Sequence, residues 1–258
     1  MVWHGGCNEE ARLTNGVPMN TSTYISLSGQ NARERQMEVL ANNIANLSTA
    51  GFKGERLLFN EYLANAKGSD PSSYVSMAGN ARDMSQGALT HTGNPLDVAL
   101  NGEGFLAVTQ PDGTTGYTRN GHLQLDAQGE LVTSAGYVIQ GDGGSAIVIP
   151  PGAGQITIGA DGSVSTKQGS VGKIPVVNFD KPQSLVSASA TLYTTDQTPT
   201  PVPTTQVMQG TIEESNVQPV LEMTKLMNAS HEVAGMKNFV DGEHQRLKTA
   251  IDRLGKSI

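Results

Sequence analysis

The sequence contains little cysteine, few aromatic side chains and few basic residues. Cys7 is its only cysteine, which excludes an intrachain disulfide and a thiolate metal cluster. Aromatic residues make up 5% of the chain and glycine occurs 30 times in 258 residues, which favours many turns over a dense aromatic core. With 17 basic and 24 acidic residues the net charge is −7, and this argues against broad electrostatic binding to nucleic acid or anionic lipid.

Long apolar runs are also missing. No run approaches the roughly 20 residues that a membrane-spanning helix needs. The first eighteen residues, MVWHGGCNEEARLTNGVP, lack the basic and apolar regions of a secretory signal peptide and show no periodicity. We therefore expect no cleavable signal and no direct membrane insertion. That leaves a cytoplasmic protein, or one exported by a machine that reads another feature.

Two short patterns resemble binding motifs, and the residues around each argue against that reading. GEGFLA at 102–107 fits the dinucleotide pattern G-x-G-x-x-A, but a strand-like run and Pro111 follow where that motif needs a helix. His231 and Glu232 begin the zinc pattern H-E-x-x-H, whose second histidine position is Gly235. There is no G-x-S-x-G motif, and the five histidines do not cluster with candidate nucleophiles. We predict no catalytic residue, no metal site, no cofactor and no enzymatic activity.

The middle of the chain has the pattern of an antiparallel β domain. Short alternating or β-branched runs recur from Leu96 onward, and glycine-rich turns such as NGEG, PDG and GDGG separate most of them. No crossover helix fits between the runs, so a parallel sheet is not expected. The predicted strands lie within LDVAL, FLAVT, HLQLD, ELVTS, YVIQ, AIVIP, QITIG and KIPVVNF.

The C-terminal part has the clearest helical periodicity. Beyond a proline- and threonine-rich stretch, we predict a helix from about 217 to 255 in which apolar residues recur every seven positions. Ala229, Met236 and Ala250 occupy a second seam position, which Glu243 and Ser257 interrupt. One helix cannot bury such a stripe alone, so the pattern predicts coiled-coil packing on other helices that is completed by neighbouring molecules. The first seam consists of Leu226, Val233, Val240, Leu247 and Leu254.

Another helix is predicted near the N-terminus, in a region where asparagines lie among the contact positions. Asn42, Asn43 and Asn46 together suggest specificity, because buried asparagine lowers stability while it fixes register and partner choice. For Asn46 alone, a place at the fraying helix end is the better interpretation. Gly51 favours the left-handed backbone that ends a helix, with Phe52 as the accompanying hydrophobic contact. The apolar positions of this helix are Met37, Leu40, Ile44 and Leu47.

The motif ANNIANLSTAGFK at 41–53 resembles the signature shared by flagellar rod and hook proteins, and it lies near the N-terminus as it does in that family. Residues 92–144 resemble the central region of these proteins and residues 210–239 their C-terminal region, so most of 19–258 is covered. The chain departs from the family in its eighteen residues before Met19 and in Ile44, where leucine is frequent.

The resemblance implies a structural subunit of the bacterial flagellar basal-body rod, which assembles with other rod proteins and copies of itself into a helical drive shaft. It further implies export through the flagellar type III apparatus, without signal cleavage, to a periplasmic rod. The length and residues 141–165 favour a proximal rod member, with the distal rod as the alternative. Axial packing is assigned to the matching signature positions, which are Asn42, Asn43, Ala45, Asn46, Thr49, Gly51, Phe52 and Lys53.

We therefore predict a mainly β central domain with N- and C-terminal α-helices that form a coiled-coil layer. Ile44, Leu47 and the C-terminal seam complete the predicted assembly interface. Two other classes stay open: a secreted glycan-binding or hydrolytic β module, which leaves the heptads unexplained, and a cytoplasmic adaptor that captures partner helices. The predicted parts are a disordered extension (1–18), the helix and signature (19–60), a connecting segment (61–90), the β domain (91–193), a Pro/Thr-rich connector (194–210) and the coiled-coil helix (211–258).

Overall fold

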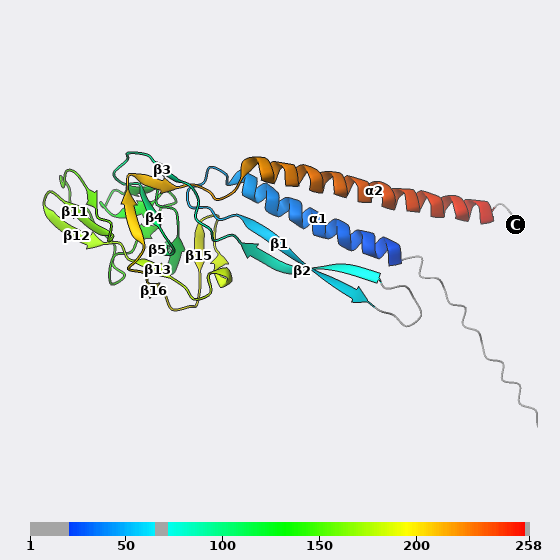
Figure 1. The fold of residues 1–258 in the computed structure, drawn as a ribbon, viewed down its shortest axis with the longest axis horizontal. Helices are drawn as coiled ribbons and strands as arrows, with labels where there is room; N and C mark the ends of the chain where they lie inside the picture. The colour runs from blue at the N-terminus through cyan, green and yellow to red at the C-terminus, as the bar shows by residue number, and fades with distance from the viewer. Residues whose placement is uncertain (1–20, 65–71, 256–258) are drawn as a thin grey trace, which may run out of the picture.

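The computed structural model describes residues 21–64 and 72–255, which form a long arm attached to a β body (Figure 1). Both predicted helices are confirmed: α1 spans Thr21–Ala45 and α2 spans Pro219–Gly255. They run side by side in opposite directions along the arm, and the C-terminus lies at the end far from the body (Figure 1). The disordered extension predicted for 1–18 lies outside the described residues.

The two helices pack in one register. Arg33 Nε lies 2.7 Å from a carboxylate oxygen of Glu232, and Asn43 Nδ2 donates a hydrogen bond of 3.2 Å to Glu222. The two residue numbers sum to 265 in each pair (33 and 232, 43 and 222), so position 244 of α2 lies opposite the start of α1 at Thr21. The last turns of α2 therefore extend beyond α1.

The predicted seam of α2 is the side that packs on α1, as far as α1 reaches. Ala229 is buried, and Leu226, Val233 and Val240 are half-buried. Leu254, beyond the start of α1, is 71% exposed. The side chain of Leu247 lies outside what the structure describes. The helices of one chain thus form an antiparallel pair, whereas a coiled-coil layer between subunits stays a prediction.

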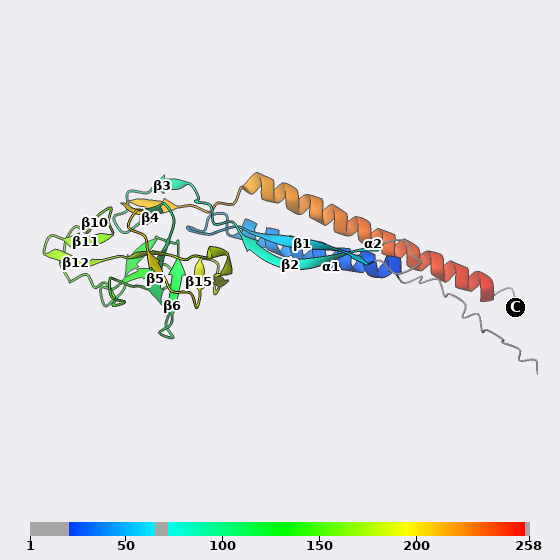
Figure 2. The same cartoon turned by 60° about the horizontal axis from the view of Figure 1, so that its bottom comes forward.

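A long β-hairpin lies along α1 on the side away from α2 (Figures 1 and 2). Its strands are β1 (Glu55–Ala64) and β2 (Ser72–Arg82), and their register shifts between Leu58 and Phe59. The segment 61–90 was predicted only as a connecting segment, so this hairpin is new. The sequence SSYVSMAGNAR of β2 is mostly small and polar, and it lacks the alternation by which strands are recognised.

The β body confirms the predicted antiparallel class, since every strand pair that the structure describes is antiparallel. Its strands are β3 (Leu89–His91), β4 (Val98–Asn101), β5 (Phe105–Thr109), β6 (Thr115–Thr118), β7 (Leu123–Leu125), β8 (Leu131–Thr133), β9 (Val138–Ile139), β10 (Thr157–Ile158), β11 (Ser163–Thr166), β12 (Gly169–Lys173), β13 (Val176–Asn178), β14 (Val186–Ser187), β15 (Leu192–Thr194), β16 (Thr200–Pro201), β17 (Gln206–Gln209) and β18 (Thr211–Glu213), with a short 3-10 helix at Pro182–Ser184.

The main sheet has the order β14-β15-β6-β5-β9-β8-β7, and β13 joins β5 to β16. Strand β5 is buried on both faces because its side chains alternate between two clusters. Leu106 and Val108 pack in the large aliphatic cluster, and Phe105 and Ala107 pack in an aromatic cluster with Tyr193. Smaller sheets pair β10-β11-β12, β4 with β17, and β3 with β18.

Several details differ from the predictions. Strands β6, β11, β14 and β15 lie outside the predicted runs, as does β12 apart from Lys173, and β18 lies in the segment 211–258 that was predicted as the coiled-coil helix. AIVIP, predicted as a strand, makes only isolated bridges at Ala146 and Val148, although Ile147 and Ile149 are buried in the core. The run ends in Pro150 and is followed by Pro151, and proline cannot donate to a ladder. The predicted connector 194–210 contains β16 and β17, and β17 pairs with β4 over its full length.

Candidate functional site

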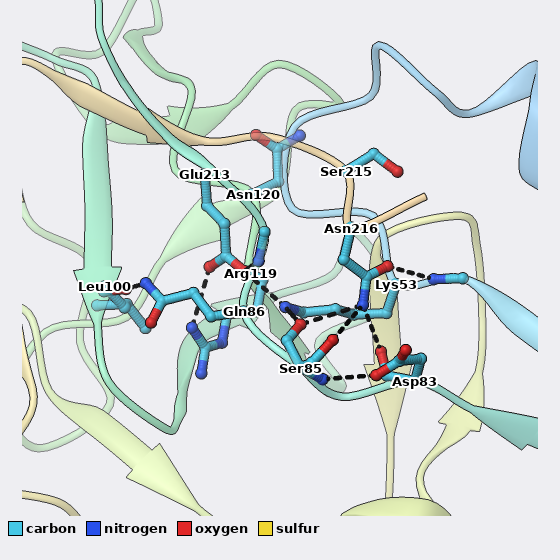
Figure 3. Close-up of polar contacts among 12 residues, drawn as sticks. Lys53, Asp83, Ser85, Gln86, Leu100, Arg119, Asn120, Glu213, Ser215 and Asn216 are labelled. Carbon is cyan, nitrogen blue, oxygen red and sulfur yellow. Dashed lines mark hydrogen bonds and ion pairs between the residues drawn. The ribbon is translucent and has the colours of Figure 1, made fainter. Parts of the chain in front are cut away.

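The arm meets the β body where three distant segments cross, 51–54, 83–88 and 213–216; we call this crossing the joint (Figure 3). Gly51 N donates to the carbonyl of Glu213 at 2.8 Å. Asp83 N donates to the carbonyl of Gly54, also at 2.8 Å. The chain thus enters the hairpin after α1, leaves it toward the body, and returns toward α2 through one hydrogen-bonded crossing.

The centre of the joint is a buried ionic group. Lys53 Nζ lies 2.5 Å from Glu213 Oε1, and Arg119 Nη1 lies 3.0 Å from Glu213 Oε2. The three side chains are 1%, 0% and 5% exposed for Lys53, Glu213 and Arg119, respectively. Gly87 N also donates to Glu213 Oε1, at 3.0 Å, and Arg119 Nη2 donates to the carbonyl of Gly102 at 2.7 Å. One carboxylate therefore holds two cations from different parts of the chain.

Burial lowers the pKa of Lys53 below its usual value, because desolvation disfavours the ammonium, while the Glu213 carboxylate opposes that shift. The ammonium also donates to the carbonyl of Ser85 at 2.6 Å. Lys53 therefore joins Glu213, on the C-terminal side of the joint, to the segment that follows β2. A buried ion pair stabilises the fold mainly when both charged partners are present, since a buried charge without its partner destabilises the protein.

Asn216 holds the outer side of the joint. Its Oδ1 accepts a 2.8 Å hydrogen bond from Gly54 N, and its Nδ2 donates to the carbonyls of Asp83 at 2.8 Å and Ser85 at 3.1 Å (Figure 3). Hydrogen bonds from the Ser85 hydroxyl and amide lower the pKa of the Asp83 carboxyl, which favours its charged form. All three crossing segments are thus connected by side chains as well as by backbone.

Gly51 has the predicted left-handed backbone, with φ +71°, but it lies six residues beyond the end of α1 at Ala45. It belongs to a turn closed by Phe52 N and the carbonyl of Thr49, at 3.2 Å. A β-carbon at position 51 would lie 2.4 Å from the backbone carbonyl carbon of Arg119. Glycine is required there both by φ and by the close approach of the β body.

The three asparagines have different roles. Asn43 is buried: its Oδ1 accepts from Glu55 N at 2.9 Å, and its Nδ2 donates to the Glu55 carbonyl at 2.8 Å and to Glu222. It therefore fixes the register of α1, β1 and α2 within one chain. Asn42 is exposed, and Asn46 Nδ2 donates to the Asn42 carbonyl at 2.9 Å at the helix end. The interpretation of Asn46 as a helix-end residue is confirmed.

We expect Asn43→Ala to lower the free energy of unfolding by about 1–3 kcal/mol, because buried groups of Glu55 and Glu222 lose their partner. Asn42→Ala is the matched control on the exposed side of the same turn, and it should change stability by less than about 0.5 kcal/mol. Urea unfolding of both variants, followed by circular dichroism, measures the difference. Equal effects would show that Asn43 does not hold the register.

The other predicted interface residues are spread over the end of α1 and the joint. Phe52 is buried, Ile44, Leu47 and Thr49 are half-buried, and Ala45 is exposed. Sequence reasoning missed Glu213, Arg119 and Asn216. One feature of the sequence could have indicated Glu213: it is a charged residue at a position of GTIEESN where a strand would bury its side chain. Nothing in the sequence indicates which cations it contacts.

Two kinds of site are absent from the described part of the chain. Within residues 21–64 and 72–255, no group of three His, Cys, Asp or Glu side chains could hold a metal ion. Within the same residues, neither helix combines the length and the apolar character needed to cross a membrane.

Comparison with known families gives three matches along the chain. Residues 24–53 match the family described as Flagella basal body rod protein, and they contain most of α1 and the start of the joint. Residues 99–166 match the Flagellar hook protein FlgE/F/G D1 domain, which lies in the β body. Residues 208–232 match the Flagellar basal body rod FlgEFG protein C-terminal family, which includes Glu213 and the first turns of α2.

Relatives are similar over nearly their whole length. The flagellar basal-body rod protein FlgF of Caulobacter vibrioides is 40% identical over 244 residues, 92% of this chain and 99% of the relative. FlgF of Rhizobium meliloti is 33% identical over 93% of this chain and 100% of the relative. The flagellar basal-body rod protein FlgG of Buchnera aphidicola is 35% identical over 81% of this chain and 90% of the relative.

Proposed function

This chain belongs to the flagellar basal-body rod protein family and is a structural subunit of that rod, and from this we propose that it occupies the proximal part of the shaft. The resemblance of the sequence to a proximal rod member supports this position, and the FlgF relatives described above match more of the chain than the FlgG relative does. A distal position is the alternative.

The mechanical role that we propose follows from the shape of the molecule. The arm of α1, α2 and the hairpin enters an inner layer of packed helices, and the β body forms an outer layer. The joint holds the two at a fixed angle, so that torque applied to one layer reaches the other. No bond is made or broken in this role, and the protein acts without catalysis.

The observation that carries this proposal is the number of large apolar side chains that stay exposed on α2 after it has packed on α1. A single soluble molecule gains nothing from such a surface, whereas an assembly buries it, at about 25 cal/mol for each Å² of apolar area. Among the α2 side chains that the structure describes, the large exposed apolar ones are Val220, Leu221, Met223, Met227, Phe239, Ile251 and Leu254.

The partners that we propose are other rod proteins and further copies of this chain. Export would proceed through the flagellar type III apparatus without a cleavable signal, and the assembled subunit would lie in the periplasmic rod. We propose no nucleic-acid partner and no direct insertion into a membrane.

Fractionation tests the proposal. Flagellar basal bodies are purified from producing cells and probed by mass spectrometry for peptides of this chain, with cytoplasm and membrane fractions as controls. We expect the chain in basal bodies, together with other rod proteins, in a strain whose hook and filament genes are deleted. Recovery only from the cytoplasm would contradict the proposal.

A seam substitution tests the role of the arm. Val240→Asp places a charge on the half-buried side of α2 that packs on α1, so we expect at least about a tenfold loss of the chain from basal bodies while the β body stays folded. Asn238→Asp, on the exposed side of the same turn, is the control and should assemble normally. Normal incorporation of Val240→Asp would show that the helix pair is not needed.

A further inference from the structure

A second contact between the arm and the β body lies beside the joint, where β2 ends at Arg82. The side chain of Gln183, in the short 3-10 helix, binds the backbone of this residue twice. Arg82 N donates to Gln183 Oε1 at 3.2 Å, and Gln183 Nε2 donates to the Arg82 carbonyl at 2.8 Å. Arg82 Nη1 also donates to the carbonyl of Leu185 at 3.2 Å. We call these contacts between Arg82 and residues 183–185 the latch.

The guanidinium of Arg82 is held by the arm and by the body at once. Its Nη2 lies 2.5 Å from Glu55 Oε1 on β1, and its Cζ lies 4.7 Å from the ring centroid of Tyr193 on β15. A guanidinium at this distance is attracted to the face of an aromatic ring. Strand β15 lies at the end of the body that faces the arm (Figures 1 and 2). Arg82, 11% exposed, thus bridges the hairpin and the body.

The hairpin has few other polar connections to the body. Of the hydrogen bonds and ion pairs that the structure describes for β1 and β2, those that reach the body all involve Arg82. The extensive packing between described helices and strands likewise lies within the arm or within the body. The direction of the arm is therefore fixed by the joint, where three segments cross, and by the latch.

The joint and the latch differ in their access to water. Lys53, Glu213 and Arg119 are almost completely buried, so opening the joint would leave charges without partners. In the latch Gln183 is exposed, and water can replace its hydrogen bonds to the Arg82 backbone at a small net cost. Contacts of this kind open locally while the rest of a protein stays folded. The latch should therefore open more readily than the joint.

We propose that the latch sets the angle between the arm and the β body, and that its release lets the arm swing about the intact joint. The proposal rests on the mechanical role proposed above and adds to it the place where one subunit yields under load. Arg82 is the positioning residue, and Gln183 holds it in place. While the latch is closed, the joint and Arg82 together define one direction of the arm.

Label distances in the isolated chain test the proposal. In a Cys7→Ser background, spin labels are attached at Ser230→Cys on α2 and at Ala135→Cys in the turn between β8 and β9, which are both exposed positions. Double electron–electron resonance then measures the distribution of separations between the label on the arm and the label on the body.

Three variants of the labelled chain are compared. Arg82→Ala and Gln183→Ala each remove part of the latch. Arg56→Ala removes an exposed cation from β1 and is the matched control. We expect a distribution at least about twofold wider in both latch variants than in the unaltered labelled chain, and an unchanged width in the control.

Hydrogen exchange shows whether the joint stays closed. Gly51 N and Gly54 N donate to the Glu213 carbonyl and to Asn216 Oδ1 in the joint, and their exchange should stay as slow in the latch variants as in the unaltered chain. An unchanged label distribution in either latch variant, or a wider one with faster exchange at these two amides, would overturn the proposal. If Arg82→Ala does not fold, Gln183→Ala decides alone, because that side chain is exposed.

The latch and the proposed function can fail separately. The label distances are measured in the isolated chain, so an unchanged distribution counts against the latch alone. Absence of the unaltered chain from basal bodies would instead overturn the proposed function.

Discussion

Replacing Glu213 with glutamine should lower the free energy of unfolding by about 3–5 kcal/mol, because it leaves two buried cations without their counter-charge. Lys53 and Arg119 both contact this carboxylate and are almost completely buried. Neither cation can turn to water without opening the joint. Urea unfolding of the full chain, followed by circular dichroism, measures the loss.

The neighbouring residue provides a matched control. Glu214 is exposed and accepts a hydrogen bond from the Thr90 hydroxyl at 2.8 Å. Glu214→Gln removes the same charge one position along and should change stability by less than about 0.5 kcal/mol. If the two glutamine variants unfold at the same urea concentration, the ionic group does not hold the joint together.

Gly51→Ala should strongly destabilise the joint, because it adds a methyl group where the turn meets the β body. The new β-carbon has to occupy space 2.4 Å from the Arg119 backbone and 2.5 Å from Asn120 N, at a φ of +71°. Backbone cannot yield as a flexible side chain can, so the turn and the β body must separate. We expect a loss of about 4 kcal/mol or more in urea unfolding, with failure of the variant to enter basal bodies.

A second glycine separates the two causes of the Gly51→Ala effect, which are the backbone strain at positive φ and the collision with the β body. Gly136 has a φ of +83°, and a β-carbon there would meet no atom within 4 Å. Gly136→Ala should therefore show only the backbone cost, about 1–3 kcal/mol. A Gly51→Ala variant no less stable than Gly136→Ala would mean that the close approach at the joint is not a constraint.

The helices and the class of the β body were predictable because both depend on local periodicity. The α2 seam repeats every seven residues over a long stretch, and Leu226, Val233 and Val240 indeed lie on the side that faces α1. The strand FLAVT was predicted as one run, and it is the central strand β5, buried on both faces. Such patterns depend only on residues within one segment of the chain.

The joint was not predictable, because its partners are far apart in sequence. Lys53 and Glu213 are 160 positions apart, and Arg119 comes from a third region. The signature pointed to Asn43, Gly51 and Lys53, but as contacts for neighbouring subunits. In the structure these three residues also hold their own chain together, by register, by close approach and by charge, respectively.

The hairpin was missed for a different reason. Strand β2 has few apolar residues, and its Gly79 at a φ of +138° breaks the pattern further. What stabilises the hairpin is its position against α1, which is a tertiary effect (Figure 2). A two-stranded ribbon alone is only marginally stable in water.

Methionine oxidation compared between the isolated chain and intact basal bodies tests the central claim, that the apolar surface of α2 is covered only in the rod. Met223 and Met227 are 49% and 61% exposed on α2, and Met208, 38% exposed on the β body, is the internal reference. After brief peroxide treatment and mass spectrometry, we expect Met223 and Met227 to be oxidised readily in the isolated chain and at least about tenfold more slowly in basal bodies, relative to Met208. Unchanged relative oxidation rates of Met223 and Met227 in basal bodies would contradict the account.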